Sequence, residues 1–170
     1  MAFLENELLT IAELSGNHDG SLSQALKLID SLSESGVKAI KLQTYTADTI
    51  TLDCNQEDFV IKDRDSLWYG YNLYQLYHKA HTPWEWHKEI FDKCKKLNIV
   101  CFSSPFDESA VNLLEKLKCP AYKIASAEIN HIPLLQKVAK TKKPVILSIG
   151  LATKQDIDKA VSVLNKIYNK

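Results

Sequence analysis

The sequence predicts an α/β fold, an incomplete (β/α)8 TIM barrel of about five βα units. Short apolar runs alternate five times with amphipathic helical patterns, which is typical of parallel strands covered by helices. The third to fifth runs start about 22 residues apart, a short repeat that favours a barrel. A complete barrel needs roughly 250 residues, and the chain has 170. We therefore expect residues 1–170 to form the N-terminal portion of a barrel, without its later strands.

The first half of the chain contains two predicted strands and one predicted helix. The run LLTIA (8–12) is strand-like, and GSLSQALKLIDSLSESG (20–36) places apolar residues at helical spacing, with Gly36 as the stop. The second strand is VKAIKL (37–42). A long, aromatic stretch from about residue 44 to Ala80 shows no regular period, so we predict an irregular segment there.

The second half alternates more regularly. TPWEWHKEIFDKCKKLN (82–98) predicts a helix in which Thr82 and Glu85 form a capping box and Pro83 takes the first helical position. A weaker capping box, Thr153 with Asp156, opens the last helix. Between these two helices we predict, in order, a strand at 99–102, a helix at 108–117, a strand at 121–125, a helix at 133–140 and a strand at 144–148.

Composition excludes several function classes. The 21 basic residues balance the 21 acidic ones, so the chain lacks the charge footprint of a protein that binds nucleic acid or an anionic membrane. No run approaches the ~18 apolar residues of a membrane span, and the N-terminus lacks a signal-peptide pattern, which together predict a cytoplasmic location. The four cysteines show no metal-site spacing, and we interpret them as reduced thiols of the core.

Each predicted strand ends in polar side chains. Parallel α/β folds bind ligands at the carboxyl ends of their strands, so these residues would share one rim. They are Glu13, Asn17, His18, Lys41, Gln43, Ser103, Ser104, Lys123, Ser126, Glu128 and Ser148. Two lysines and several small hydroxyls suit a ligand that carries a phosphate and a carboxylate. Glu13 and Glu128 would accept hydrogen bonds from water or sugar hydroxyls, or act as a general base.

Simpler interpretations stand beside this one. The amine of Lys41 would extend to solvent from an amphipathic strand, and any one serine would serve as a cap or turn residue. Ser103 and Ser104 alternate, so at most one of them faces the barrel axis. His18 would hold its turn through a backbone hydrogen bond rather than bind a metal or move a proton.

Five segments, in order, resemble the N-terminal barrel of the sialic acid synthase family. They are AELSGNHDGSLSQALKLID, GVKAIKLQTYTADTIT, LNIVCFSSPFD, AYKIASAEINHIPLL and KKPVILSIGLAT. The likeness is strongest to the pseudaminic acid synthases within that family. It implies an enzyme of carbohydrate biosynthesis that condenses phosphoenolpyruvate with an N-acetylated amino sugar, here a 2,4-diacetamido-2,4,6-trideoxy hexose, and releases phosphate.

The resemblance also implies a role for each rim residue. Phosphoenolpyruvate would be held by Lys41, Gln43, Ser104, Lys123, Ser126 and Ser148. Glu13 would be catalytic, handling the water or proton beside the reacting carbons, and Glu128 would bind the amino sugar. A divalent metal, Mn²⁺ or Mg²⁺, would polarise the sugar aldehyde as a Lewis acid.

The chain departs from the family pattern in ways that limit its expected activity. The family's metal-binding histidines lie beyond residue 170, so this chain would hold no metal ligand. We would also expect this chain to lack the family's C-terminal antifreeze-like domain, which closes the partner subunit's site in the expected homodimer. Ile149 stands where the family usually has threonine. We therefore expect the isolated chain to be inactive unless another chain supplies the missing half.

Three alternatives remain open. The sugar would be that of an N-acetylneuraminate or legionaminic acid synthase, or the chain would be a non-catalytic fragment with exposed sheet edges. A Schiff-base aldolase on the same fold would use Lys41 or Lys123 as its nucleophilic amine.

Overall fold

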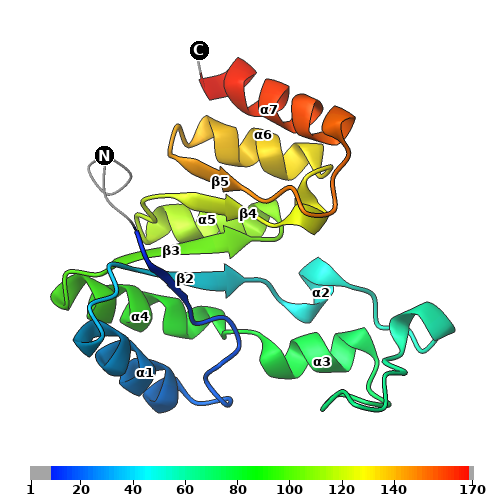
Figure 1. Cartoon of the computed structure of the whole chain (residues 1–170), viewed down its shortest axis with the longest axis horizontal. Helices are drawn as coiled ribbons and strands as arrows, with labels where there is room; N and C mark the ends of the chain where they lie inside the picture. Colours follow the sequence, from blue (N-terminus) through cyan, green and yellow to red (C-terminus); the bar gives the residue numbers. More distant parts are fainter. Residues whose placement is uncertain (1–8, 169–170) are drawn as a thin grey trace.

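The computed structural model describes residues 9–168, with side chains as far as residue 166, and shows half of a barrel. Its five parallel strands follow one another in chain order across a single sheet (Figure 1). The strands are β1 (Ile11–Glu13), β2 (Ala39–Thr44), β3 (Val100–Pro105), β4 (Tyr122–Ile124) and β5 (Val145–Leu147). Each of the five predicted runs overlaps one of these strands, and β1, β2 and β3 extend one to three residues beyond their predicted ends. Leu8, in the first predicted run, lies outside the described residues.

The register of β2 with its neighbours decides which side chains share a face. Lys41 lies opposite Glu13 of β1, and Gln43 lies opposite Ser104 of β3. Successive side chains of a strand point to opposite faces, so Ile40 and Leu42 occupy the other face. Both are fully buried in the cluster that packs under α1 and α4. Lys41 and Gln43 therefore lie on the face without helices, which is the inside of the half-barrel.

Helices follow the strands and cover the outer face of the sheet (Figure 1). The predicted helices are present as α1 (Leu22–Glu34), α4 (Trp84–Lys96), α5 (Glu108–Lys116), α6 (Ile132–Lys140) and α7 (Lys154–Tyr168). One core cluster joins β1 and β2 to α1 and α4, and a second joins β3, β4 and β5 to α5, α6 and α7. No described helix is long and apolar enough to cross a membrane.

Three signals that the sequence gives for helix ends can be compared with the structure, and two of them are confirmed. Gly36 ends α1 as expected, because its φ of 82° is one that glycine adopts without strain. Thr153 and Asp156 form their predicted capping box through reciprocal side-chain to backbone bonds of 2.9 and 3.2 Å. The Thr82–Glu85 box is wrong. Pro83 is the N-cap of α4, and the hydroxyl of Thr82 donates instead to the carbonyl of Ser15 at 3.1 Å.

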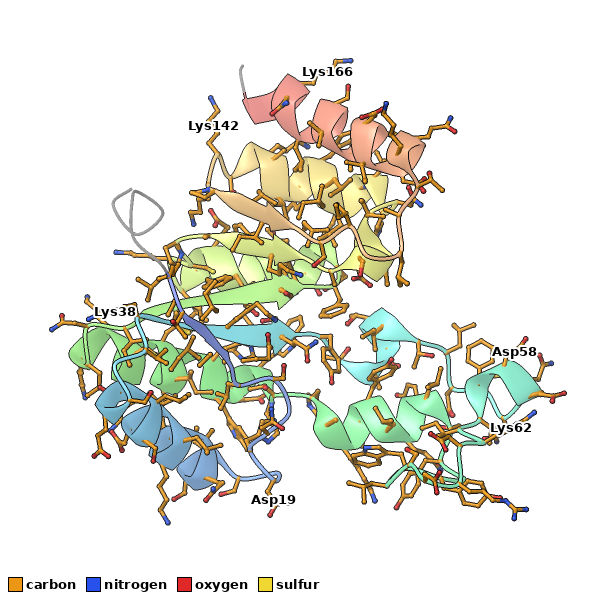
Figure 2. The ribbon with its side chains drawn as sticks, in the orientation of Figure 1. Asp19, Lys38, Asp58, Lys62, Lys142 and Lys166 are labelled. Atoms are coloured by element: carbon orange, nitrogen blue, oxygen red, sulfur yellow. The ribbon has the colours of Figure 1, made fainter. Side chains whose placement is uncertain are left out.

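The long aromatic segment leaves the sheet after β2 and returns at α4; we call residues 45–81 the excursion. It holds α2 (Ala47–Ile50), a short 3-10 helix η2 (Glu57–Phe59) and α3 (Leu73–Ala80). The prediction of an irregular segment is therefore wrong for α3, which a capping box of Asn72 and Gln75 opens. Figure 2 shows Asp58 and Lys62 at its outer end, far from the strands, whereas α2 lies at the tip of β2 (Figure 1).

The interpretation of the cysteines as free thiols of the core agrees with the structure. All four are unpaired; three of them, Cys94, Cys101 and Cys119, are buried, and Cys54 is half-buried. Burial raises the pKa of the Cys119 thiol to about 11, so this group is neutral and behaves as a small apolar side chain.

A buried polar network fastens α4 to the outer face of the sheet. The hydroxyl of Thr44 lies 2.6 Å from that of Ser103 and 2.9 Å from Nε2 of His87. Nδ1 of His87 lies 3.1 Å from the carbonyl of Pro83. All three side chains are fully buried. Burial lowers the pKa of His87 to about 4, so the imidazole stays neutral well below its ordinary range.

We predict that His87 makes the fold sensitive to acid. The unfolded chain binds a proton at His87 near pH 6.5, while the folded chain binds it near pH 4. The contribution of His87 is therefore complete above pH 6.5 and is lost as the pH falls towards 4, by roughly 3 kcal/mol. Urea unfolding at about pH 7.5 and about pH 4.5 measures this loss. A His87→Gln variant keeps a polar group but does not titrate, and an equal pH dependence in both proteins would contradict the prediction.

Candidate active site at the carboxyl rim

Glu13 and Lys41 meet at the inner rim, where β1 and β2 end. Nζ of Lys41 lies 2.6 Å from Oε2 of Glu13 and 2.8 Å from Oε1. The hydroxyl of Ser15 donates to the same carboxylate. The Lys41 side chain is 14% exposed and that of Glu13 is 45% exposed, so the pair borders solvent. The amine of Lys41 therefore does not extend freely into water, and that simpler interpretation of this residue is wrong.

Lys123 and Ser148 form a second pair on the neighbouring strands. Nζ of Lys123, in β4, donates to the hydroxyl of Ser148, which follows β5 directly. The backbone N–H of Ser148 donates to the carbonyl of Ile124, which fixes this turn. Ile149, where the sequence departs from the family pattern, is 52% exposed.

The two lysines act on each other electrostatically. Desolvation by burial lowers the pKa of Lys123, and the positive charge of Lys41 lowers it further. The carboxylates of Glu13 and Glu128 oppose this by favouring the charged amine. Four predicted site residues from three strand ends therefore lie close enough to perturb one another. An anionic ligand at this point would relieve the repulsion between the two amines.

The structure separates the two serines of β3, as alternation requires. Ser103 is on the outer face, in the network with Thr44 and His87. Ser104 lies opposite Gln43 on the inner face and is 2% exposed. The expectation that only one of them faces the barrel axis agrees with this arrangement, and Ser104 is the one.

Ser126 and Glu128 lie in the short 3-10 helix η3 (Ser126–Glu128) directly after β4. The Glu128 side chain is half-buried, and its Oε2 atom has no hydrogen-bond partner among the described residues. Burial raises the pKa of the Glu128 carboxyl, and the nearby His131 and Lys123 oppose that rise. A buried oxygen without a partner costs stability unless a ligand or water satisfies it. Glu128 is therefore positioned to accept a hydrogen bond from a bound molecule.

A cavity of about 360 Å³ opens at this end of the sheet. Its polar side is formed by Gln43, Ser126 and Glu128, which are three of the predicted site residues. The rest of its wall consists of Tyr45, Ile50, Tyr77, Phe106, Ala125, Ala127 and Leu151. The cavity is therefore lined by residues of the strand ends and of the excursion, and three aromatic side chains form part of its wall.

Sequence reasoning missed the aromatic wall. Tyr45 and Phe106 each follow a strand by one residue, so their position at the strand ends was the signal that could have found them. Tyr77 carries no such signal, because it lies on α3 in the excursion, which no periodicity tied to the rim. Ser15 was missed as the neighbour that orients the carboxylate of Glu13.

The loop after β1 is fixed by close packing. A side chain at Gly16 would place its Cβ 2.7 Å from the carbonyl oxygen of Ala80, so only glycine fits there. His18 is buried, and its Nδ1 accepts the backbone N–H of Gly20 at 3.2 Å, which agrees with the interpretation of His18 as a turn residue. Asn17 is exposed on the same loop.

The described residues do not offer a metal site of their own. Between residues 9 and 168, no group of three or more histidine, cysteine, aspartate or glutamate side chains lies close enough together to hold a metal ion. The groups at the rim that bear charge are two amines and two carboxylates, and the amines lie next to the carboxylates. We therefore derive no chemical step through a metal from this chain.

The structure is a half-barrel of parallel strands, and lysines, carboxylates and small hydroxyls lie at the carboxyl ends of these strands. These features define a (β/α) barrel protein with a polar rim. More narrowly, the chain belongs to the NeuB family, whose profile matches residues 28–170. It is 46% identical over 159 residues to the pseudaminic acid synthase of Helicobacter pylori, covering 94% of this chain and 46% of that protein.

Further relatives and a solved structure agree with this assignment. A Campylobacter jejuni pseudaminic acid synthase is 44% identical, over 97% of this chain and 48% of that protein. The crystal structure of N-acetylneuraminic acid synthetase from Leptospira borgpetersenii, in complex with citrate, has a TM-score of 0.77 at 30% identity. That match covers 95% of this chain and 51% of that one. The chain thus spans about half the length of the relatives it matches.

We predict that the charge state of Lys123 depends on its rim neighbours. Lys41→Met raises the pKa of Lys123, because the positive charge of Lys41 lowers it, and Glu128→Gln lowers that pKa, because the carboxylate of Glu128 raises it. Reductive ¹³C-methylation followed by NMR titration reports each amine separately. Lys38→Met, at the opposite end of β2, serves as the matched control. An unchanged Lys123 titration in Lys41→Met would show that the two amines do not interact.

Proposed function

We propose that this chain provides the phosphoenolpyruvate half-site of a nonulosonic acid synthase of the pseudaminic type. The reaction joins phosphoenolpyruvate to a 2,4-diacetamido-2,4,6-trideoxy hexose and releases phosphate. The observation that carries the proposal is the approach of Lys41, paired with Glu13, and Lys123, bonded to Ser148, at one rim that also holds a cavity lined by Glu128. The chain has a higher sequence identity to the pseudaminic acid synthases than to the legionaminic acid synthases. This difference supports the diacetamido-trideoxy hexose as the sugar.

The anionic groups of phosphoenolpyruvate fit the hydrogen-bond donors of the rim. Lys41 and Lys123 contribute two positive charges, and a phosphate or carboxylate between them would replace the repulsion of the amines by attraction. Hydroxyl and amide donors surround them at the ends of β2, β3, β4 and β5. These residues are Gln43, Ser104, Ser126 and Ser148.

The proposed reaction forms one carbon–carbon bond and one carbon–oxygen bond, and breaks the carbon–oxygen bond to phosphate. C3 of phosphoenolpyruvate attacks the aldehyde carbon of the sugar, a water oxygen adds at C2 and becomes its ketone oxygen, and phosphate leaves with the oxygen that joined it to C2. The water gives up two protons, one to the aldehyde oxygen and one to the departing phosphate. Glu13, held by Lys41 and Ser15 at the rim, is the group we assign to this proton transfer.

Glu128 is the group we assign to the amino sugar. Glu128 lines a cavity of about 360 Å³, and its carboxylate would accept a hydrogen bond from a sugar hydroxyl. The divalent metal that the family implies, Mn²⁺ or Mg²⁺, would be bound by residues outside this chain. When bound, it would supply Lewis-acid polarisation of the sugar aldehyde.

We predict that the chain binds phosphoenolpyruvate through both rim lysines. Lys41→Met and Lys123→Met each remove a charge-assisted hydrogen bond, typically 1.5–3 kcal/mol, so the dissociation constant rises roughly 10- to 100-fold. Isothermal titration calorimetry measures the change. Lys38→Met leaves it unaltered, because Lys38 lies at the amino end of β2, far from the rim (Figure 2). Equal affinity in all four proteins would remove the lysines from the site.

A Schiff-base aldolase is the second candidate, and the lowered pKa of Lys123 is the observation that favours it. Borohydride reduction in the presence of pyruvate separates the two functions. A synthase gives no adduct with pyruvate, because its rim lysines hold an anion as charged amines and do not act as nucleophiles. A reduced pyruvyl group on Lys123 or Lys41, found by mass spectrometry, would establish the aldolase instead.

We predict that synthase activity appears when the barrel is completed. A fusion of this chain to the C-terminal part of the Helicobacter pylori relative, with Mn²⁺, releases phosphate only when both phosphoenolpyruvate and the diacetamido sugar are present. The 170-residue chain alone releases none. Replacing Glu13 by Gln in the fusion lowers the rate by about 10²- to 10⁴-fold, the usual contribution of an acid–base group.

The intact Helicobacter pylori relative, assayed beside the fusion, controls for substrate and metal. A folded fusion that releases no phosphate while the relative does would overturn the proposal. Faster release with N-acetylmannosamine than with the diacetamido sugar would change the assigned sugar and keep the reaction.

A further inference from the structure

We propose that the aromatic wall formed by Tyr45, Tyr77 and Phe106 receives a methyl group of the sugar, and that Tyr77 of α3 determines this selectivity. The inference rests on the proposed function, because it takes the molecule in the cavity to be the sugar. It goes further by assigning substrate choice to the excursion and not to the strands.

The three rings form one continuous surface. Tyr45 lies in the middle, with its ring centroid 5.6 Å from that of Tyr77 at an interplanar angle of 81°, and 5.3 Å from that of Phe106 at 75°. These edge-to-face contacts are the favoured geometry of aromatic pairs. The indole N–H of Trp84 donates to the backbone carbonyl of Tyr45 at 3.2 Å, which holds the central ring in place. The wall is therefore formed before any ligand binds.

The wall is also uncharged. Burial raises the pKa of the Tyr45 hydroxyl to about 12, and the neighbouring Tyr77 adds to that rise. Aliphatic carbons of Ile50 and Ala125 also line the cavity. A methyl group placed against the ring faces would gain contact area, whereas a hydroxyl there would lose its water and could regain a partner only at the phenolic hydroxyls of Tyr45 and Tyr77.

The polar residues of the cavity determine how a sugar lies in it. Gln43, Ser126 and Glu128 line it together with the aromatic and aliphatic residues. A hexose that places its hydroxyls against these three residues presents its other edge to the rings. The mixed lining thus favours an apolar substituent, and not a hydroxyl, at the aromatic wall.

Tyr77 differs from the other two rings in its support. Tyr45 and Phe106 are 5% and 8% exposed and follow β2 and β3, so they belong to the core at the strand ends. Tyr77 is half-buried and stands on α3, away from the sheet. Its replacement removes the outer part of the wall without disturbing the strands that carry the lysines. It is therefore the position at which selectivity can be tested separately from phosphoenolpyruvate binding.

Two sources supply a methyl group, and matched ligands distinguish them. A deoxy sugar carries one on its ring, and an acetamido group carries one beyond its carbonyl. The first pair of ligands is an N-acetyl-6-deoxyhexosamine and its 6-hydroxy counterpart. The second is the N-acetyl and N-formyl forms of one hexosamine, which keep the amide and differ by the methyl alone.

The experiment measures binding of both pairs to the 170-residue chain by saturation-transfer NMR, in the presence of phosphoenolpyruvate. We expect about fourfold tighter binding of the methyl-bearing ligand in one pair, the gain for burying a single methyl group. A preference in the first pair assigns the ring methyl, and a preference in the second assigns the acetamido methyl. Tyr77→Ala and Tyr77→Gln reduce the preference to within about twofold, whereas Tyr77→Phe retains it because the ring remains.

Tyr69→Ala is the matched control, because Tyr69 is an exposed aromatic residue of the same excursion that does not line the cavity. It keeps the preference of the unaltered chain. Equal binding within both pairs, or a preference that persists in Tyr77→Ala and Tyr77→Gln, would overturn the inference. So would the absence of sugar binding from a chain that still binds phosphoenolpyruvate. If the unaltered chain does not bind phosphoenolpyruvate, the result counts against the proposed function instead. Failure of the inference and failure of the proposed function are therefore distinguishable.

Discussion

The parallel register of β2 between β1 and β3 is the constraint on which the site depends. It places Lys41 opposite Glu13 and Gln43 opposite Ser104, so that four polar side chains from three strands face the inside of the half-barrel. A shift of one residue would turn Lys41 into the helix layer and Leu42 into the rim. The buried positions of Ile40 and Leu42 against α1 and α4 oppose that shift, because it would expose both side chains. Packing on the outer face thus maintains the polar inner face.

The same register has a polar counterpart on the outer face. Thr44 and Ser103 lie on neighbouring strands and share a hydrogen bond, and His87 reaches them from α4. Buried polar groups tolerate few alternative arrangements, because each lost partner leaves an unsatisfied atom. The network therefore fixes α4 at one position along the sheet. Since α4 follows the excursion directly, it also fixes the point at which the excursion returns, and with it the site of α3.

The barrel could be predicted from the sequence because each unit carries a local signal. The strands are apolar runs, the helices show a regular period, and the polar strand ends fall at one rim once the strands are parallel. The capping box at Thr82 failed because its hydroxyl has a competing long-range acceptor, the carbonyl of Ser15, which no local pattern reveals. Helix α3 was missed for a related reason. It has only eight residues, and its position depends on contacts with the rim that lie far away in the sequence.

The half-barrel divides its site between two kinds of segment. Strand ends hold the charged groups, and their spacing is fixed by the sheet, so the distance between Lys41 and Lys123 cannot change without moving the core. The excursion leaves the sheet after β2, returns at α4 and supplies Tyr45, Ile50 and Tyr77 to the cavity. Substitutions there alter the shape of the cavity while the register of the strands remains. Under the proposed function, the strand ends would hold the anionic substrate, and Tyr45 and Tyr77 of the excursion would act with Phe106 on the choice of sugar.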